Sequence, residues 1–165
     1  MIIPFRQEWY EQALEEQRQR EPYMLTKFKN TPARKEGQKR GLVIQHHVSG
    51  WFKENYPDHY LEADNFRQWD KICSHDFKLK VKAGVICIDV SGPDKDGNFG
   101  CYYEKPTAGV DFHILCKPLG FKAWNDCDFT RGFEISGVLK SQDYLTRIDP
   151  QQIIGFQTWL NNIGL

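Results

Sequence analysis

The stretch from His75 to Gly92, HDFKLKVKAGVICIDVSG, constrains the fold more than any other part of the chain. Alternating apolar and basic residues from Phe77 to Val81 predict one β-strand. The nearly continuous apolar run from Val85 to Val90 predicts a second strand, buried on both faces. Ala83 and Gly84 stand between the two runs and predict a tight turn. The stretch is therefore expected to form a β-hairpin.

This hairpin also gathers polar side chains at one end. With residues 83–84 as the loop, Asp76 faces Ser91 across the two strands. In the same register Lys78 faces Asp89. Because side chains alternate at period two, all four are expected on one side of the sheet. Two carboxylates and an ammonium group suit a hard divalent cation and a developing oxyanion. The pattern predicts a catalytic or metal-binding site here.

Along the rest of the chain, helical and strand patterns alternate. We expect helices over residues 5–21, from Thr31 to about Tyr56 and from Asp149 to about Asn161, further strands at Val110 to Cys116 and Gly132 to Lys140, a loop or short helix at 58–72, and irregular structure at 119–130. This order indicates an α/β fold with a mixed central sheet. A chain of 165 residues is expected to form a single domain, with residues 1–31 as a helical extension of a core at 32–165.

Composition sets limits on the environment of the chain. Lys and Arg together number 22, as do Asp and Glu, so net charge indicates no polyanionic partner. The first residues lack the pattern of a signal peptide, and no apolar window is long enough to cross a bilayer. The five cysteines form no CxxC pair and are expected to be reduced. We therefore expect a cytoplasmic protein without a membrane partner.

One segment is locally basic despite the balanced total. It carries Lys27, Lys29, Arg34, Lys35, Lys39 and Arg40 against a single acid, Glu36. Such a run is either a solvated helix face or a surface that contacts nucleic-acid phosphates. Histidines give weaker signals. Adjacent His46 and His47 point about 100° apart on a helix and are interpreted as packing and surface residues. His113, among apolar neighbours, is interpreted as a satisfied core or edge histidine.

Short motifs add a resemblance to a known family. The run Arg40 to Gln45 reads RGLVIQ, Asp76 stands at the first strand, and Asp89-Val90-Ser91 ends the second. This order resembles the PD-(D/E)XK nuclease superfamily over roughly residues 36–140. The family pattern is a helix with an acid, a strand with an Asp, and a strand ending in (Asp/Glu)-x-Lys. The resemblance implies a restriction-endonuclease-like fold, with a mixed central sheet flanked by helices.

The resemblance also implies roles for particular residues. Asp76, Asp89 and the main-chain carbonyl of Val90 would hold Mg²⁺ or Mn²⁺, which activates a water molecule for phosphodiester hydrolysis. Two positions depart from the family, because Gln45 stands for the helix acid and Ser91 for the lysine. Serine has no positive charge with which to stabilise the transition state. We hypothesise that Lys78 supplies the ammonium group and that Gln45 is an outer ligand through its amide oxygen.

Three functions fit these residues. The leading hypothesis is a magnesium-dependent endonuclease, a hydrolase that cuts double-stranded DNA and forms a homo-oligomer, since cutting two strands usually requires two sites. The second is a catalytically inert nucleic-acid-binding module on the same fold. The third is an unrelated α/β protein in which the hairpin is only structural. Cleavage separates the first two, and DNA affinity separates both from the third.

Overall fold

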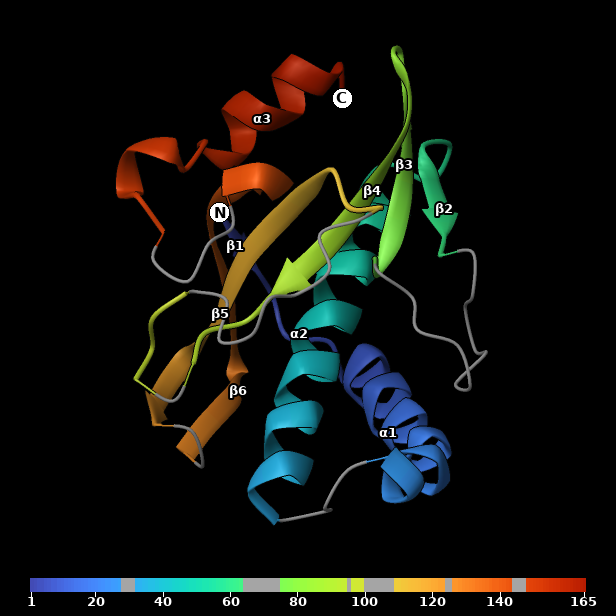
Figure 1. Cartoon of the computed structure of the whole chain (residues 1–165), viewed down its shortest axis with the longest axis vertical. Helices are drawn as coiled ribbons and strands as arrows, with labels where there is room; N and C mark the ends of the chain where they lie inside the picture. Colours follow the sequence, from blue (N-terminus) through green and yellow to red (C-terminus); the bar gives the residue numbers. More distant parts are fainter. Residues whose placement is uncertain (28–31, 64–74, 95, 100–108, 124–125, 144–147) are drawn as a thin grey trace.

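The computed structural model describes residues 1–27, 32–63, 75–94, 96–99, 109–123, 126–143 and 148–165. Six strands form one sheet in the order β1-β6-β5-β4-β3-β2 (Figure 1). The elements are β1 (Ile2–Ile3), α1 (Gln7–Lys27), α2 (Pro32–Asn55), β2 (Tyr60–Glu62), β3 (Phe77–Val81), β4 (Gly84–Ser91), β5 (Phe112–Ala123), β6 (Asp126–Lys140), two 3₁₀ turns, η1 (Ser141–Asp143) and η2 (Pro150–Gln152), and α3 (Phe156–Ile163). Strands β4 and β5 run parallel, and the other neighbouring pairs are antiparallel. The predicted α/β class with a mixed sheet is confirmed.

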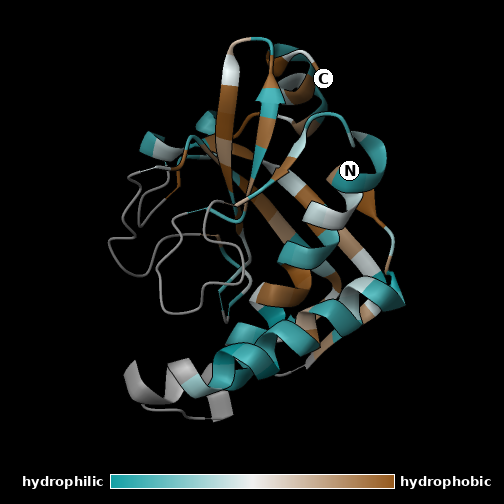
Figure 2. Cartoon of the chain, turned by 90° about the vertical axis from the view of Figure 1, so that its right-hand side faces the viewer, coloured by the Kyte–Doolittle hydropathy of each residue, from teal (hydrophilic) through white to brown (hydrophobic). Residues whose placement is uncertain are grey.

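Helices α1 and α2 lie side by side, and α2 packs against the sheet (Figure 1). Hydrophilic residues dominate α1, whereas hydrophobic residues are concentrated in the strands (Figure 2). At the helix contact the ring of Trp9 lies against Gly50, where a Cβ atom would come within 2.4 Å of the ring. Ile3, Trp9 and Ala13 are all buried in the main core. Residues 1–31, predicted to extend the core, thus contribute a strand and a helix to it.

The hairpin β3–β4 has a different register from the predicted one. Val81 pairs with Gly84, so the two loop residues are Lys82 and Ala83. Gly84 has a φ of 131°, which other residues rarely adopt. Glycine is favoured at the fourth position of a common turn as well as in its centre, and composition alone does not separate the two registers. The prediction that Lys78 faces Asp89 was wrong, because Lys78 pairs with Cys87.

Strands β5 and β6 are longer than predicted. Residues 119–130, expected to be irregular, continue β5 to Ala123 and begin β6 at Asp126. The β5–β6 ladder shifts register between Pro118 and Gly120. The pairing of β5 with β4 has already ended at Leu115. Proline lacks an N–H donor and is tolerated at bulges and at strand edges. Pro118 therefore marks a bulge in this strand and does not end it.

The C-terminal helix begins later than predicted. The carboxylate of Asp149 accepts a hydrogen bond from the N–H of Gln151 at 2.9 Å, but this cap starts only a single 3₁₀ turn. Ile154 then exchanges backbone hydrogen bonds with Val138 of β6. Helix α3 starts at Phe156. A 3₁₀ turn and the bridge of Ile154 to β6 thus occupy the residues on which the first part of a continuous helix was expected.

Candidate functional site at the hairpin

Asp76 lies at the start of β3 and is bound to the backbone of β4. Its own N–H donates to the carbonyl of Ile88 at 2.8 Å, and its Oδ2 accepts from the N–H of Val90 at 2.7 Å. Val90 directly follows Asp89. Asp76 and Asp89 therefore lie at the same end of the hairpin, and Asp76 contacts the backbone of the residue that follows Asp89.

Asp89 turns toward the neighbouring strand β5. Its Oδ2 lies 3.0 Å from Nδ1 of His113, the residue that pairs with it in the parallel ladder. The same oxygen accepts a hydrogen bond from the Ser91 hydroxyl at 3.1 Å. Ser141 approaches His113 from the other side, with its Oγ 3.4 Å from Nε2. His113 is 1% exposed and Ser91 3%, whereas the Asp89 side chain is 13% exposed, so this network fixes a carboxylate that solvent still reaches.

The network bears on two predictions. The interpretation of His113 as a satisfied, buried histidine is confirmed by its contacts with Asp89 and the two serines. Ser91, at the position where the nuclease family has a lysine, is hydrogen-bonded to Asp89 and brings no charge. Lys78 lies on the same face of the hairpin as Asp89, because Cys87, its partner, alternates with Ile88.

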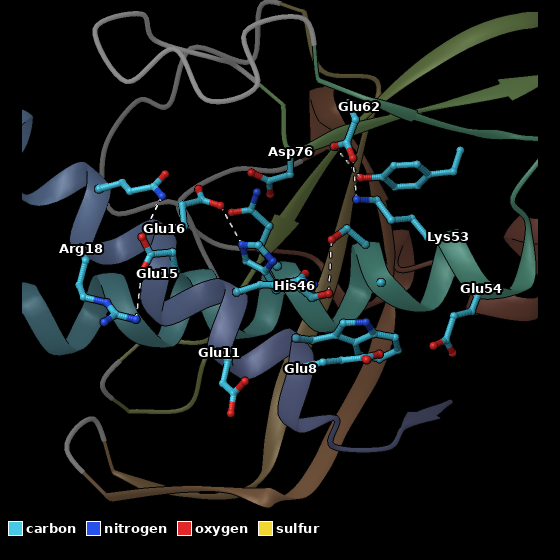
Figure 3. Close-up of a pocket in the computed structure, with 17 residues that line it drawn as sticks. Glu8, Glu11, Glu15, Glu16, Arg18, His46, Lys53, Glu54, Glu62 and Asp76 are labelled. Carbon is cyan, nitrogen blue, oxygen red and sulfur yellow. Dashed lines mark hydrogen bonds and ion pairs between the residues drawn. The ribbon is translucent and has the colours of Figure 1, made fainter.

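A groove with a volume of about 820 Å³ lies between α1, α2 and β2 (Figure 3). Gln45 of α2 and Asp76 both line it, so two of the predicted site residues share this space. Its charged residues are mostly acidic: Glu8, Glu11, Glu15, Glu16, Glu54, Glu62 and Asp76, against Arg18 and Lys53. Such a lining attracts cations and repels phosphate groups.

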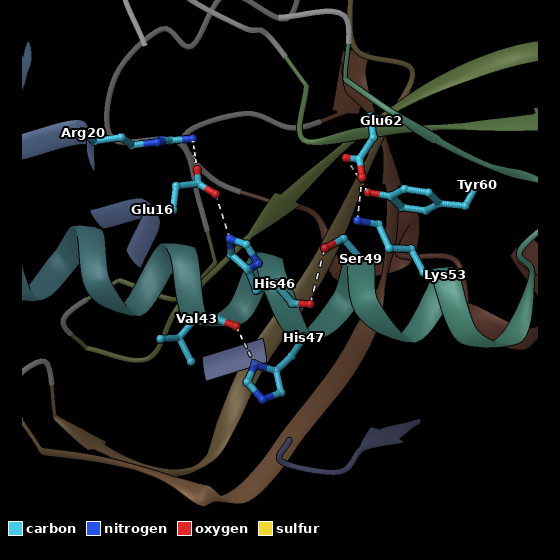
Figure 4. A network of polar contacts seen from close by, with 9 residues as sticks. All are labelled: Glu16, Arg20, Val43, His46, His47, Ser49, Lys53, Tyr60 and Glu62. Carbon is cyan, nitrogen blue, oxygen red and sulfur yellow. Dashed lines mark hydrogen bonds and ion pairs between the residues drawn. The ribbon is translucent and has the colours of Figure 1, made fainter. Parts of the chain in front are cut away.

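A buried ionic cluster joins α1 to α2 on this groove (Figure 4). Glu16 is 7% exposed and is bonded both to Arg20 and, at 2.7 Å, to Nε2 of His46. Burial by itself would raise the pKa of Glu16. The hydrogen bond from His46 and the charge of Arg20 outweigh burial and hold that pKa below its usual value. The cluster therefore keeps Glu16 ionised within the helix contact.

At the other end of the groove, β2 is bound to α2. The Tyr60 hydroxyl donates to Glu62 at 3.2 Å, and Lys53 forms an ion pair with the same carboxylate. Lys53 also lies over the Tyr60 ring, 4.9 Å from its centroid. Burial, and then the negative charge of Glu62, raise the pKa of Tyr60. The phenol therefore stays protonated as a hydrogen-bond donor.

His47 fixes the start of α1 to α2. Its Nδ1 lies 2.7 Å from the Val43 carbonyl, and its Nε2 accepts from the N–H of Arg6 at 3.2 Å. These two bonds require a neutral ring with the proton on Nδ1. His47 is completely buried, with the Phe133 ring 4.2 Å away between centroids. Burial lowers the pKa of His47 to about 4. The interpretation of His47 as a packing residue is confirmed.

This histidine predicts a specific acid lability. An unfolded histidine takes up its proton near pH 6.5, whereas His47 in the folded chain does so only near pH 4. The unfolded state binds more protons between these values, so stability falls as the pH drops through this window, by about 3 kcal/mol in all. We expect urea unfolding from pH 7 to pH 4 to show this loss. His47→Phe, which cannot titrate, should lose less stability over the same range.

The matched control for this experiment is His59→Gln, which removes a partly exposed histidine. It should retain the full pH dependence of the wild-type protein. If the unfolding free energy falls equally with pH in the wild-type protein and in His47→Phe, the assignment to His47 is contradicted.

The described residues of the basic segment contact other parts of the protein. Lys35 forms an ion pair with Glu21. The Arg40 guanidinium is 5.5 Å from the Phe121 ring centroid, and burial lowers the pKa of Arg40. Lys39 lies 5.9 Å from the centroid of the Tyr10 ring. Lys29 and the side chains of Lys27 and Arg34 lie outside what the structure describes.

Two general properties complete the description of the site. Within the described ranges, no three His, Cys, Asp or Glu side chains are grouped so as to hold a metal ion by themselves. Nor does any helix in the described part of the chain have the length and apolar character needed to span a membrane. Cys116 is a buried core thiol that forms no disulfide, and burial raises its pKa.

Comparison with known proteins adds no relative. No protein-family model matches the sequence, and no curated protein or solved structure shows significant similarity to it. The site is therefore interpreted from its own geometry. Sequence reasoning missed two of its parts, the contact of His113 with Asp89 and the burial of Glu16 against His46. For His113, the one local signal is a polar residue inside the apolar run VDFHILC.

Proposed function

We propose that this chain is a magnesium-dependent endonuclease of the PD-(D/E)XK type that hydrolyses phosphodiester bonds in DNA. The observation that carries the proposal is the position of Asp76 and Asp89 at the same end of the hairpin, where Asp76 accepts a hydrogen bond from the N–H of Val90, the residue after Asp89. Gln45 supports it, because this α2 residue lines the same groove as Asp76. A helix residue, a first-strand acid and a second-strand acid are the three positions on which the family resemblance rests.

The donor atoms at this end of the hairpin suit a hard cation. The carboxylates of Asp76 and Asp89, the carbonyl of Val90 and the amide of Gln45 all offer oxygen. Mg²⁺ prefers oxygen ligands and is commonly held by only one or two carboxylates, with water and substrate phosphate completing its shell. Asp76, Asp89 and Val90 would hold the ion, and Gln45 would bind its water. When bound, the ion would polarise the phosphate and lower the pKa of a water molecule.

The surrounding residues take supporting roles in this proposal. His113 and Ser91 hold the Asp89 carboxylate in place through Oδ2. Lys78 remains our proposed source of the ammonium group, since it shares a face of the hairpin with Asp89. Because cutting both strands of a duplex usually requires two active sites, we further propose a homo-oligomer, which sedimentation of the purified chain would detect.

The function is tested by incubating the purified chain with plasmid and mixed genomic DNA. We expect nicked and linear products with Mg²⁺ or Mn²⁺ and none with EDTA. DNA binding is read in the same samples at several salt concentrations, because phosphate contacts weaken as salt rises. Salt-sensitive binding without cleavage would instead establish the inert binding module, for which the uncharged Ser91 is the structural argument. If the chain neither binds nor cleaves DNA, both the nuclease and the inert binding module are rejected.

A further inference from the structure

The tip of the β3–β4 hairpin extends beyond its neighbours in the sheet (Figure 1). On one side the ladder with β2 reaches only to Leu79, and on the other the ladder with β5 begins at Ile88. The backbone of Lys80 is still bonded to His59, and that of Cys87 to Asp111, so the two-stranded ribbon at the tip comprises residues 81–86. A two-stranded ribbon whose other face is covered can bind a partner along its open face.

The two faces of the ribbon differ sharply. Leu79 and Val81 are buried in the main core, so one face is covered by the protein. On the opposite face, Lys80 is exposed and pairs with Val85, which is 52% exposed. Lys82 in the turn is also exposed. The open face is thus basic, and a partner of opposite charge would be attracted to it.

This basic face leads to the candidate site. Lys80, Lys78 and the hairpin-end acids follow one another along the strand, with alternate residues about 7 Å apart. Asp76 also lines the acidic groove beside α1 and α2, whereas the Asp89 carboxylate points to His113 of β5. One nearby acid, Asp111, accepts the N–H of Cys87 through Oδ2 at 2.8 Å. A phosphate backbone would therefore be repelled from the groove and would reach Asp89 from the lysine face.

We propose that this face, defined by Lys78, Lys80 and Lys82 and here called the lysine ribbon, binds the sugar-phosphate backbone of duplex DNA and directs it toward Asp89. The inference rests on the proposed function for its substrate, and it replaces the segment at residues 27–40 as the principal phosphate-binding surface. Phosphate contacts of this kind fix the position and register of a duplex without reading its sequence. The ribbon therefore supplies affinity, and sequence preference lies elsewhere.

The test is DNA binding by the double variant Lys80→Gln, Lys82→Gln, measured by fluorescence anisotropy with a 20-base-pair duplex in EDTA. We expect affinity to fall about tenfold or more near 0.1 M salt. The plot of the logarithm of the binding constant against the logarithm of salt concentration should become less steep by about 2 units, one for each phosphate contact removed. The loss should be similar for unrelated duplex sequences. Both lysines are exposed, so the variant should melt at the wild-type temperature.

The matched control is Lys35→Gln, Lys39→Gln, which removes the same charge from α2. It should bind as the wild-type protein does. Wild-type affinity in the ribbon variant, or an equal loss in the control, would overturn the lysine ribbon. Loss of single-stranded RNA binding with duplex binding unchanged would overturn the assignment to DNA. Cleavage by the wild-type protein is measured separately. If the ribbon variant loses DNA affinity but the wild-type protein does not cleave, only the nuclease proposal is rejected. If the wild-type protein cleaves and the ribbon variant binds DNA normally, only the lysine-ribbon proposal is rejected.

Discussion

Asp76→Asn and Asp89→Asn are each expected to reduce metal-dependent DNA cleavage by more than about a hundredfold. Replacing even an outer partner of a metal ligand commonly costs ten- to a hundredfold in activity, and these two carboxylates are the proposed ligands themselves. Asparagine is the informative substitution because its amide oxygen can still accept the hydrogen bonds from Val90 and Ser91. The change removes the negative charge and leaves the local structure in place.

Three measurements make this result specific. Thermal melting should show both variants folded, and DNA binding in EDTA should stay near the wild-type level or increase, since a negative charge has been removed near the phosphates. Asp58→Asn, in the exposed turn before β2, is the matched control and should cleave normally. Wild-type cleavage by both site variants would show that the hairpin end is not the catalytic site.

Phe52→Ala is expected to destabilise the fold by about 4 kcal/mol, a large part of the 5–15 kcal/mol typical of a domain. Phe52 is completely buried on α2. Its ring lies within 6.3 Å, between centroids, of those of Trp51, Tyr56, Phe77, Phe156 and Trp159. It thus joins α2 to both β3 and α3. Truncation would remove apolar contacts on all sides and leave a cavity.

Urea unfolding at pH 7 measures this effect. Val85→Ala is the matched control, because Val85 is 52% exposed and should change stability by less than about 0.5 kcal/mol. A loss below about 1 kcal/mol for Phe52→Ala would show that α3 and β3 do not depend on this contact. The same comparison distinguishes a folding defect from a site defect in any later variant near the hairpin.

Local patterns explain why most elements could be predicted. The helix at Pro32–Asn55 has a proline at its first position and a broad apolar face, and both signals depend only on nearby residues. The hairpin is also a local structure. The failures come from longer-range forces: β5 continues to Ala123 and β6 begins at Asp126 because each strand supplies the other with a partner, despite Pro118. Ile154 is drawn into a bridge with Val138 for the same reason.

The candidate site divides in the same way. Asp76 and Asp89 could be selected from sequence because they lie at the open end of a short hairpin, although the turn at Lys82 and Ala83 shifts the register by two residues along β4. His113 reaches Asp89 only because β5 lies parallel to β4, a pairing between strands joined by a long connection. No nearby sequence signal specifies that neighbour. Local sequence patterns therefore could not predict contacts between side chains that a crossover connection brings together.

Strand β1 has a consequence for how the chain is assembled. The amino group of Met1 donates to the carbonyl of Ile135, 134 residues further along the chain, and Ile2 pairs with Glu134. During synthesis the first strand leaves the ribosome long before its partner exists, so the sheet edge at β6 closes late. Joining such distant segments carries a loop-closure cost that nearer pairings do not. Strand β1 can therefore join the sheet only after the segment that carries β6 has been synthesised.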